Sequence, residues 1–309
     1  MKNNFWENLK KPFFAMAPMA GITDSSFRQM CVRFGADVVY SEMASATALV
    51  YAPEKTLEIL QFEKKERPYV VQLFGAEPKH FVEATKIITK EIKPNGIDIN
   101  FGCPVKKVQK QGAGAVLMKD FKKSRAIIEN VINNTDLPVS IKTRTRVDNK
   151  SILDFLEFIK DLDIKALMIH GRTLAQGFSG AIDTETIKKA RDFFSGVLMA
   201  NGGVYSRAEA EKLLQATGVD GIGIARGALG RPWIFSEIKD LDFPKSKEEK
   251  FKIVLEHVKL AEKHKGQQGV IEMRKHLCWY AKGFEGASEL RRELIQVETI
   301  RDIKKILKY

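Results

Sequence analysis

Eight short apolar runs, separated by amphipathic segments, limit what this 309-residue chain can fold into. Each run is too short for a lone buried helix and is rich in β-branched or other apolar residues, as strands covered on both faces are. The segments between them, such as 81–92 and 206–217, place apolar residues at helical spacing. The runs lie at 12–19, 36–43, 69–75, 96–102, 138–144, 166–172, 197–203 and 221–227.

Eight strand–helix units within the first 240 residues are typical of a (β/α)8 TIM barrel, an α/β fold in which helices surround a closed parallel sheet. A doubly wound open sheet is the alternative, but it rarely needs eight such regular repeats. We therefore predict a TIM-barrel domain over residues 1–240. In such a barrel the chemistry takes place at the carboxyl ends of the strands.

The pattern changes after residue 240, where no strand signal remains. Residues 241–250 are rich in charge and contain a proline, which is typical of a linker. Ser246, followed three residues later by Glu249, predicts a capping box that opens a helix. We expect a C-terminal all-helical domain over 241–309, with helices broken by glycines and lying at about 247–265, 270–284 and 287–307.

The charge of the chain is positive and uneven. Lys and Arg number 51 against 39 Asp and Glu, and residues 245–309 alone hold 16 basic and 10 acidic side chains. Half of the excess therefore lies in the last fifth of the chain. A basic tail favours a polyanionic partner such as nucleic acid. A lysine-rich but merely solvated surface is the alternative that composition leaves open.

Composition also bounds the class of protein. With 29% charged and 44% hydrophobic residues the chain has the balance of a soluble globular protein, which excludes a disordered or fibrous one. Three scattered cysteines indicate a reducing cytoplasm rather than a disulfide framework. No apolar run is long enough for a signal peptide or a membrane span, and we predict a cytoplasmic protein without a membrane or an obligate protein partner. The five histidines lack ligand spacing, so no metal site is expected.

Chemically distinctive residues lie at or just beyond the ends of the apolar runs, namely Met19, Glu42, Gln72, Asn100, Lys142, His170, Asn201 and Arg226. In a barrel these positions open onto one face. The last two runs are followed by glycine-containing loops, Asn201-Gly202-Gly203 and Ala225-Arg226-Gly227, at the strand ends that commonly build a phosphate site. Some of the eight residues can instead cap strands, and Glu42 fits either role.

Cys103 follows the fourth run, in a segment that also contains Lys106, Lys107 and Lys110. These lysines are expected to lower the pKa of the thiol and to favour the thiolate. A thiol that serves as an acid must instead keep its proton, so charge alone leaves its role open. Cys31 and Cys278 are expected to be structural.

Taken together, seven blocks in order resemble the tRNA-dihydrouridine synthases over nearly the whole chain: APMAGITD (17–24), VQLFG (71–75), NFGCP (100–104), IKTR (141–144), IHGRT (169–173), ANGG (200–203) and RGA (226–228). The segments GRPWIF (230–235), RKH (274–276) and WY (279–280) look most like the bacterial B-type branch. Leu174, Phe178 and Thr145-Arg146-Val147 depart from the family's usual pattern and bear on the RNA contacts.

The resemblance implies an FMN-bound barrel that uses NADPH as reductant. FMN would be held by Pro18, Met19, Ala20 and Gln72, with Lys142 and His170 at the isoalloxazine edge and with Asn201, Gly202, Gly203, Ala225 and Arg226 around the phosphate. Hydride would pass from flavin N5 to C6 of a uridine, and Cys103 would protonate C5 as general acid. The product would be 5,6-dihydrouridine.

The resemblance also implies tRNA as the substrate, with the target uridine in the D-loop. The nucleotide would be extruded into the pocket, where Asn100, Arg144 and Arg172 are candidates for contacting it. Lys275, His276, Trp279 and Lys282 would contact RNA from one predicted helix. Two other functions stay open from the residues: an FMN barrel that acts on a free pyrimidine or dihydroorotate-like metabolite, and a non-catalytic RNA-binding protein.

Overall fold

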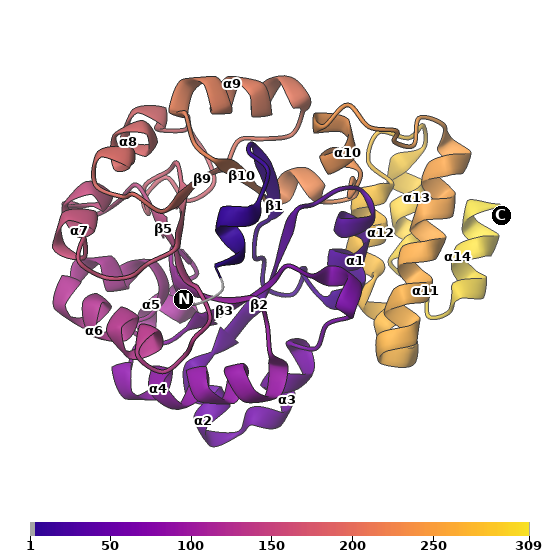
Figure 1. Ribbon diagram of the computed structural model, residues 1–309. Helices are drawn as coiled ribbons and strands as arrows, with labels where there is room; N and C mark the ends of the chain where they lie inside the picture. Colours follow the sequence, from indigo (N-terminus) through magenta and orange to yellow (C-terminus); the bar gives the residue numbers. More distant parts are fainter. Residues whose placement is uncertain (1–3, 309) are drawn as a thin grey trace.

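The computed structural model describes residues 4–308 and contains a closed barrel of eight parallel strands (Figure 1). The barrel closes where β1 pairs with both β2 and β10. Each of the eight predicted runs coincides with one strand, although β2 extends two residues past its run, and this confirms the predicted TIM barrel. The strands are β1 (Phe13–Met16), β2 (Val38–Ser45), β3 (Tyr69–Phe74), β4 (Gly96–Phe101), β5 (Val139–Arg144), β8 (Ala166–His170), β9 (Val197–Asn201) and β10 (Gly221–Ile224).

Helices follow every strand and form the outer ring of Figure 1. A small antiparallel hairpin, β6 (Arg146–Val147) and β7 (Lys150–Ser151), follows β5. The ring consists of α1 (Ser25–Arg33), α2 (Ala46–Tyr51), α3 (Pro53–Ile59), α4 (Pro78–Ile87) with a π turn (Ile88–Ile92), α5 (Lys106–Lys110), α6 (Phe121–Ile132), α7 (Ile152–Phe158), α8 (Thr184–Lys189), α9 (Arg207–Thr217) and α10 (Ile234–Ile238).

The barrel interior is filled by side chains, so the functional site can lie only above it. Inward residues from alternate strand positions, including Phe13, Tyr40 and Met168, form one cluster with Trp6. Trp6 is fully buried, and its ring lies 6.1 Å from that of Phe13. A larger cluster between the sheet and the outer helices forms the main core. Burial on both faces explains why the strands are continuous apolar runs.

The C-terminal region is entirely helical, with α11 (Lys247–Glu272), α12 (Arg274–Tyr280), α13 (Ala287–Leu294) and α14 (Ile300–Leu307). Ser246 and Glu249 form the predicted capping box. The predicted helix boundaries need correction: the first helix continues past a kink at Gly266, and the third is two helices. The split arises because Thr299 and Asp302 form a second capping box, which starts a new helix at Ile300.

The helical region packs directly against the barrel, beside α1 and α10 in Figure 1. Met30 of α1 and Phe34, which follows this helix, share one hydrophobic cluster with Trp233 and with residues of α11 and α12. Gly230 makes the approach close, since a Cβ there would lie 2.4 Å from the carbonyl group of Trp279. The two regions therefore share a core.

Candidate active site

A cavity of about 350 Å³ opens at the carboxyl ends of the barrel strands. This volume lies within the range of ~300–1,000 Å³ that is typical of small-molecule sites. The cavity is lined by all fifteen barrel residues that the sequence predicted for the site: Pro18, Met19, Ala20, Gln72, Asn100, Cys103, Lys142, Arg144, His170, Arg172, Asn201, Gly202, Gly203, Ala225 and Arg226. The structure thus brings together residues that are up to 208 positions apart in the chain.

A buried chain of hydrogen bonds runs from the barrel interior to the Cys103 backbone. Asp98 accepts from Ser140 at 2.6 Å and from Gln72 Nε2 at 2.7 Å. Asn100 Nδ2 donates to Gln72 Oε1 at 2.8 Å, and Asn100 Oδ1 accepts from the backbone N–H of Cys103 at 2.9 Å. Both ends of the Asn100 amide therefore make hydrogen bonds within the protein. The bond to the Cys103 backbone holds Cys103 in place.

Asp98 is a residue that the sequence reasoning missed. Burial raises its pKa to about 6, although hydrogen bonds from Ser140 and Gln72 oppose the shift. The signal was present in the sequence, since Asp98 is the only charged residue in the run at 96–102. A carboxylate in a strand that is buried on both faces needs partners, and here these are side chains of β3 and β5.

Cys103 lies at the edge of the cavity and is only 7% exposed. Burial raises the pKa of its thiol, although the charges of Arg144 and Lys142 oppose the shift. The prediction that Lys106, Lys107 and Lys110 favour a thiolate is therefore wrong: these lysines are exposed on α5, and desolvation of the sulfur outweighs the nearby charges. The thiol keeps its proton at neutral pH, which is the state that an acid needs.

Lys142, in β5, lines the cavity. Its Nζ donates to Asn201 Oδ1 at 3.0 Å, and Asn201 Nδ2 in turn donates to the carbonyl of Gly223 at 2.6 Å. Burial and the charge of Arg144 lower the pKa of Lys142 to about 8, against the opposing charge of Asp98. Burial of this ammonium is unfavourable, Asp98 offsets only part of the cost, and an anionic ligand beside it would stabilise the charged form further.

His170 lies among these cations at the end of β8. Burial, together with the charges of Lys142 and Arg144, holds the pKa of His170 well below its usual range, so the ring is neutral at pH 7. Arg172 lies 3.3 Å from His170 Nε2 and donates through Nε and Nη2 to the carbonyl of Gly180. The neutral ring leaves a nitrogen available for hydrogen bonding to a ligand.

Arg144 is nearly fully buried and donates to three backbone carbonyls, those of Gly102, Thr173 and Gly177, at 2.8–3.0 Å. These bonds tie the Cys103 segment to the loop after β8. Contact of Arg144 with a nucleotide remains a prediction, and its observed effect is to brace these two loops.

The loops after β9 and β10 meet on one side of the cavity. Gly202 has a φ of +109°, and a Cβ there would lie 2.8 Å from the His170 ring, so any larger residue would disturb both backbone and imidazole. Arg226 begins a 3₁₀ turn, donates to the carbonyl of Phe178 at 3.0 Å and lies 4.9 Å above the Phe178 ring. Phe178, a residue that is 54% exposed, lines the cavity, and the sequence analysis had noted this position only as a departure from the family pattern.

The charge of the cavity is one-sided. Four of its lining residues are cations (Lys142, Arg144, Arg172 and Arg226), and none of the lining side chains in the described part of the chain is acidic. Apolar side chains, including Met19 and Leu229, cover much of the remaining wall. Such a cavity suits a ligand that combines an apolar body with an anionic group.

The four predicted residues of the tail do not form one RNA-contacting stripe. His276 is only 2% exposed and lies against Phe27 and His257, so the prediction that it contacts RNA is wrong. Trp279 is half-buried with its ring against His276, and Lys275 donates to the carbonyl of Gly21. Lys282 is exposed, just beyond the end of α12. Contact with Phe27 of α1 thus buries only His276 of the four, and the other three residues point to different surroundings.

Residues 15–308 match the family model described as dihydrouridine synthase. The chain belongs to the dihydrouridine synthase family. A relative named "tRNA-dihydrouridine synthase B", from Vibrio parahaemolyticus, is 37% identical and aligns over 90% of this chain and 88% of its own. The "Probable tRNA-dihydrouridine synthase 1" of Synechocystis is 34% identical over 94% of this chain and 84% of its own.

This membership confirms the predicted family, its bacterial B-type branch and the class of enzyme. Solved structures resemble this chain in fold alone. A variant of NCR from Zymomonas mobilis has a TM-score of 0.52 at 15% identity and covers 80% of this chain and 95% of its own. Morphinone reductase in complex with tetrahydroNAD has a TM-score of 0.54 at 11% identity and covers 78% and 91%.

Within residues 4–308, no helix combines the length and apolar character needed to cross a bilayer. The same residues contain no group of three or more His, Cys, Asp or Glu side chains arranged to hold a metal ion. The cytoplasmic location, the lack of a metal and the lack of an obligate protein partner stay predictions for this chain.

Proposed function

We propose that this protein is a tRNA-dihydrouridine synthase that uses FMN and NADPH to reduce the C5–C6 double bond of a uridine in tRNA. One observation carries the proposal: a thiol that keeps its proton, Cys103, lies at the edge of a cavity with four cations and no acidic lining residue. Hydride addition to uracil generates negative charge that must be neutralised by a proton, and this site supplies both an acid and positive charge.

The residues of the cavity fit FMN. Arg226 and the loop of Gly202 and Gly203 offer charge and close backbone approach for the phosphate. The Lys142 ammonium, whose charged form burial disfavours, suits the anionic form of a reduced flavin. Pro18, Met19 and Ala20 offer backbone and apolar surface for the ring system. When it is bound and reduced by NADPH, FMN supplies the hydride that adds to C6 of the uracil.

The roles of the chain's own residues follow from their contacts. Cys103 donates its proton to C5 of the uracil, and its raised pKa keeps that proton available at neutral pH. Asn100 acts on this step through the backbone of Cys103, because its amide is already engaged. Arg144 holds the same loop and contributes positive charge as negative charge develops on the base. Arg172 is proposed to contact the nucleotide.

We infer that tRNA reaches the cavity by extrusion of the target nucleotide, since a stacked base cannot enter a pocket at the barrel mouth. In this proposal residues 1–240 form the catalytic barrel and residues 241–309 the tRNA-binding region. The exposed lysines of α5, together with Lys282, supply charge for the surrounding backbone. A uridine of the D-loop is the proposed target.

The experiment that tests the cofactor is direct. The purified protein is expected to be yellow, to release FMN on denaturation, and to lose its colour when NADPH is added in the absence of oxygen. A colourless protein with no affinity for FMN would favour a non-catalytic RNA-binding protein. A yellow protein that reduces free uracil or a related metabolite as fast as tRNA would favour the metabolic alternative.

A further inference from the structure

The loop between β1 and α1 forms one wall of the cavity. Pro18, Met19, Ala20 and Ile22 line it directly. Thr23 closes the loop into a compact turn, because its hydroxyl donates to the carbonyl of Met19 at 3.1 Å and its backbone N–H donates to the same oxygen at 3.0 Å. The position of the whole turn therefore decides the shape of this wall.

At the outer tip of the turn, both polar groups of the Gly21 backbone are held from outside the loop. The N–H of Gly21 donates to the carboxylate of Glu42, a residue of the barrel strand β2. The carbonyl of Gly21 accepts from the ammonium of Lys275 in α12. The tip is thus held between a barrel strand on one side and the helical region on the other.

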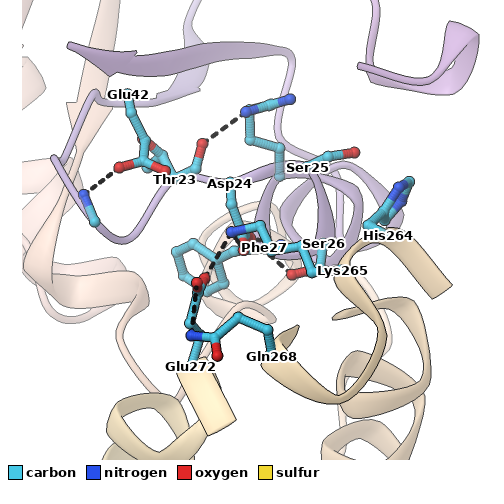
Figure 2. Close-up of polar contacts among 12 residues, drawn as sticks. Thr23, Asp24, Ser25, Ser26, Phe27, Glu42, His264, Lys265, Gln268 and Glu272 are labelled. Carbon is cyan, nitrogen blue, oxygen red and sulfur yellow. Dashed lines mark hydrogen bonds and ion pairs between the residues drawn. The ribbon is translucent and has the colours of Figure 1, made fainter. Parts of the chain in front are cut away.

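The end of the loop has a second link to the helical region. Asp24 caps α1 by accepting from the N–H of Phe27 at 3.0 Å, and its other oxygen lies 3.4 Å from Lys265 Nζ. Figure 2 shows Lys265 between the carboxylates of Asp24 and Glu272. Although burial opposes it, these hydrogen bonds and charges hold the pKa of Asp24 well below its usual range, so the carboxylate is ionised.

We propose that Glu42 and Lys275 are positioning residues for the cofactor cavity, which they shape through the Gly21 backbone. This inference rests on the proposed function only in taking FMN as the ligand. The helical region then has a second task beside RNA binding: α12 completes a wall of the site in the barrel. Lys275, which the sequence assigned to RNA, acts on the flavin pocket.

The physical argument concerns the freedom of the loop. Without the two side chains, the exposed Gly21 peptide groups would turn to water, and the turn at 19–23 would sample positions that narrow or widen the cavity. FMN binding would then have to select one position of the turn from several, and the affinity of the cavity for FMN would fall accordingly. The loss of affinity should be confined to FMN, the ligand that this wall is proposed to contact.

The test compares FMN affinity in four variants. Lys275→Met and Glu42→Ala remove the two contacts, whereas Lys275→Arg and Glu42→Gln keep a donor and an acceptor. We expect FMN to bind roughly 2- to 10-fold more weakly to the first pair, as the loss of one hydrogen bond at an exposed site implies, and near wild-type affinity in the second pair. The circular dichroism of the bound flavin should change in the first pair and recover in the second.

Lys282→Met is the matched control, since it removes an exposed lysine just beyond the same helix. It is expected to weaken tRNA binding and to leave FMN affinity unchanged. Unaltered FMN affinity and flavin spectra in both Lys275→Met and Glu42→Ala would overturn the inference, most directly if Lys275→Met weakened only tRNA binding. Failure of the wild-type protein to bind FMN would instead contradict the proposed function.

Discussion

The basic side chains of the barrel mouth and those of the helical region are held in opposite ways. Lys142 and Arg144 lie inside the protein, fixed by hydrogen bonds to Asn201 and to backbone carbonyls. Arg301, Lys304 and Lys305 project into solvent from α14. The first kind is desolvated and preorganised for one anion in one place. The second attracts any polyanion at long range and is weakened by salt.

The difference teaches that positive charge alone does not identify an RNA contact. Lys275 and Lys282 lie seven residues apart, yet one donates to the barrel loop and the other is exposed. Burial and partners separate the cations that shape the catalytic cavity from those that can meet a substrate surface. Variants in the two sets should therefore have effects of different kind and size.

The largest effect is expected in the barrel at Cys103. Cys103→Ala should reduce dihydrouridine formation by roughly 10²–10⁴-fold, because it removes the proton donor, while FMN binding and reduction by NADPH stay near wild type. Mass spectrometry of tRNA digests, together with flavin absorbance, measures both. Cys278→Ala, which alters a cysteine of the helical region, serves as control. Dihydrouridine formation at the parental rate in Cys103→Ala would refute the assignment.

The next largest effect concerns the proposed phosphate contact. Arg226→Ala should weaken FMN binding by about 1.5–3 kcal/mol, roughly 10- to 100-fold, since a hydrogen bond to a charged partner is lost. Riboflavin, which lacks the phosphate, should bind nearly as well as before. Flavin fluorescence titrations on the flavin-free protein compare the two ligands. Equal losses for FMN and riboflavin would place the phosphate away from Arg226.

A smaller effect, of a different kind, is expected on the surface. Lys282→Glu should weaken tRNA binding roughly 10-fold and reduce the slope of log affinity against log salt by about one. Lys188→Glu is the matched control, since Lys188 is exposed on α8, across the barrel from α12 in Figure 1. Binding assays over a salt series measure both. Identical salt slopes for the two variants would move the RNA surface elsewhere, most directly to Lys106, Lys107 and Lys110.

Deletion of residues 245–309 is not a clean test of the same surface. The helical region shares a hydrophobic cluster with Met30, Phe34 and Trp233, so its removal would expose apolar surface of the barrel. Charge reversal leaves that core intact. This distinction follows from the packing and could not be read from the linker-like composition of 241–250.

The smallest effect is on stability. Burial lowers the pKa of Lys142 from 10.5 to about 8, which corresponds to roughly 3 kcal/mol of unfavourable free energy for the charged form at pH 7. Lys142→Met also removes the hydrogen bond to Asn201 and the attraction to Asp98, so we expect a net stabilisation of the flavin-free protein of about 1 kcal/mol. The folded state therefore disfavours the charged lysine relative to the unfolded state. This loss of folding free energy is fully present below pH 8, where both states are protonated, and it disappears as the pH rises towards 10.5. Chemical denaturation at several pH values measures the gain, which should shrink above pH 8. A pH-independent or negative change would contradict the desolvated cation.

The barrel and its site were largely predictable, for a physical reason. Strands buried on both faces leave a period-free apolar signature, and a TIM barrel places the ends of all of them on one face. Lys142, His170 and Asn201 could therefore be assigned to one cavity from their positions alone. The position of each residue relative to the end of its own apolar run was sufficient for this assignment.

What the sequence could not supply was the set of partners across the fold. His276 is buried by contact with Phe27 of α1, which lies 249 residues earlier in the chain. The three carbonyl partners of Arg144 come from two other loops. The raised pKa of Cys103 likewise arises from desolvation by surrounding elements and not from its neighbours in sequence. Such effects depend on tertiary packing, which a pattern along one strand or helix does not contain.

The central claim is that the cavity joins a flavin to an acid for reduction of a uridine in tRNA. The most direct measurement is to reduce the protein with one equivalent of NADPH without oxygen, add tRNA that lacks dihydrouridine, and follow the flavin absorbance. The account predicts that tRNA restores the absorbance of the oxidised flavin and that free uridine does so much more slowly. Dihydrouridine should form at the same rate as the flavin is reoxidised. Reoxidation by free uridine at the same rate, or none with tRNA, would contradict it.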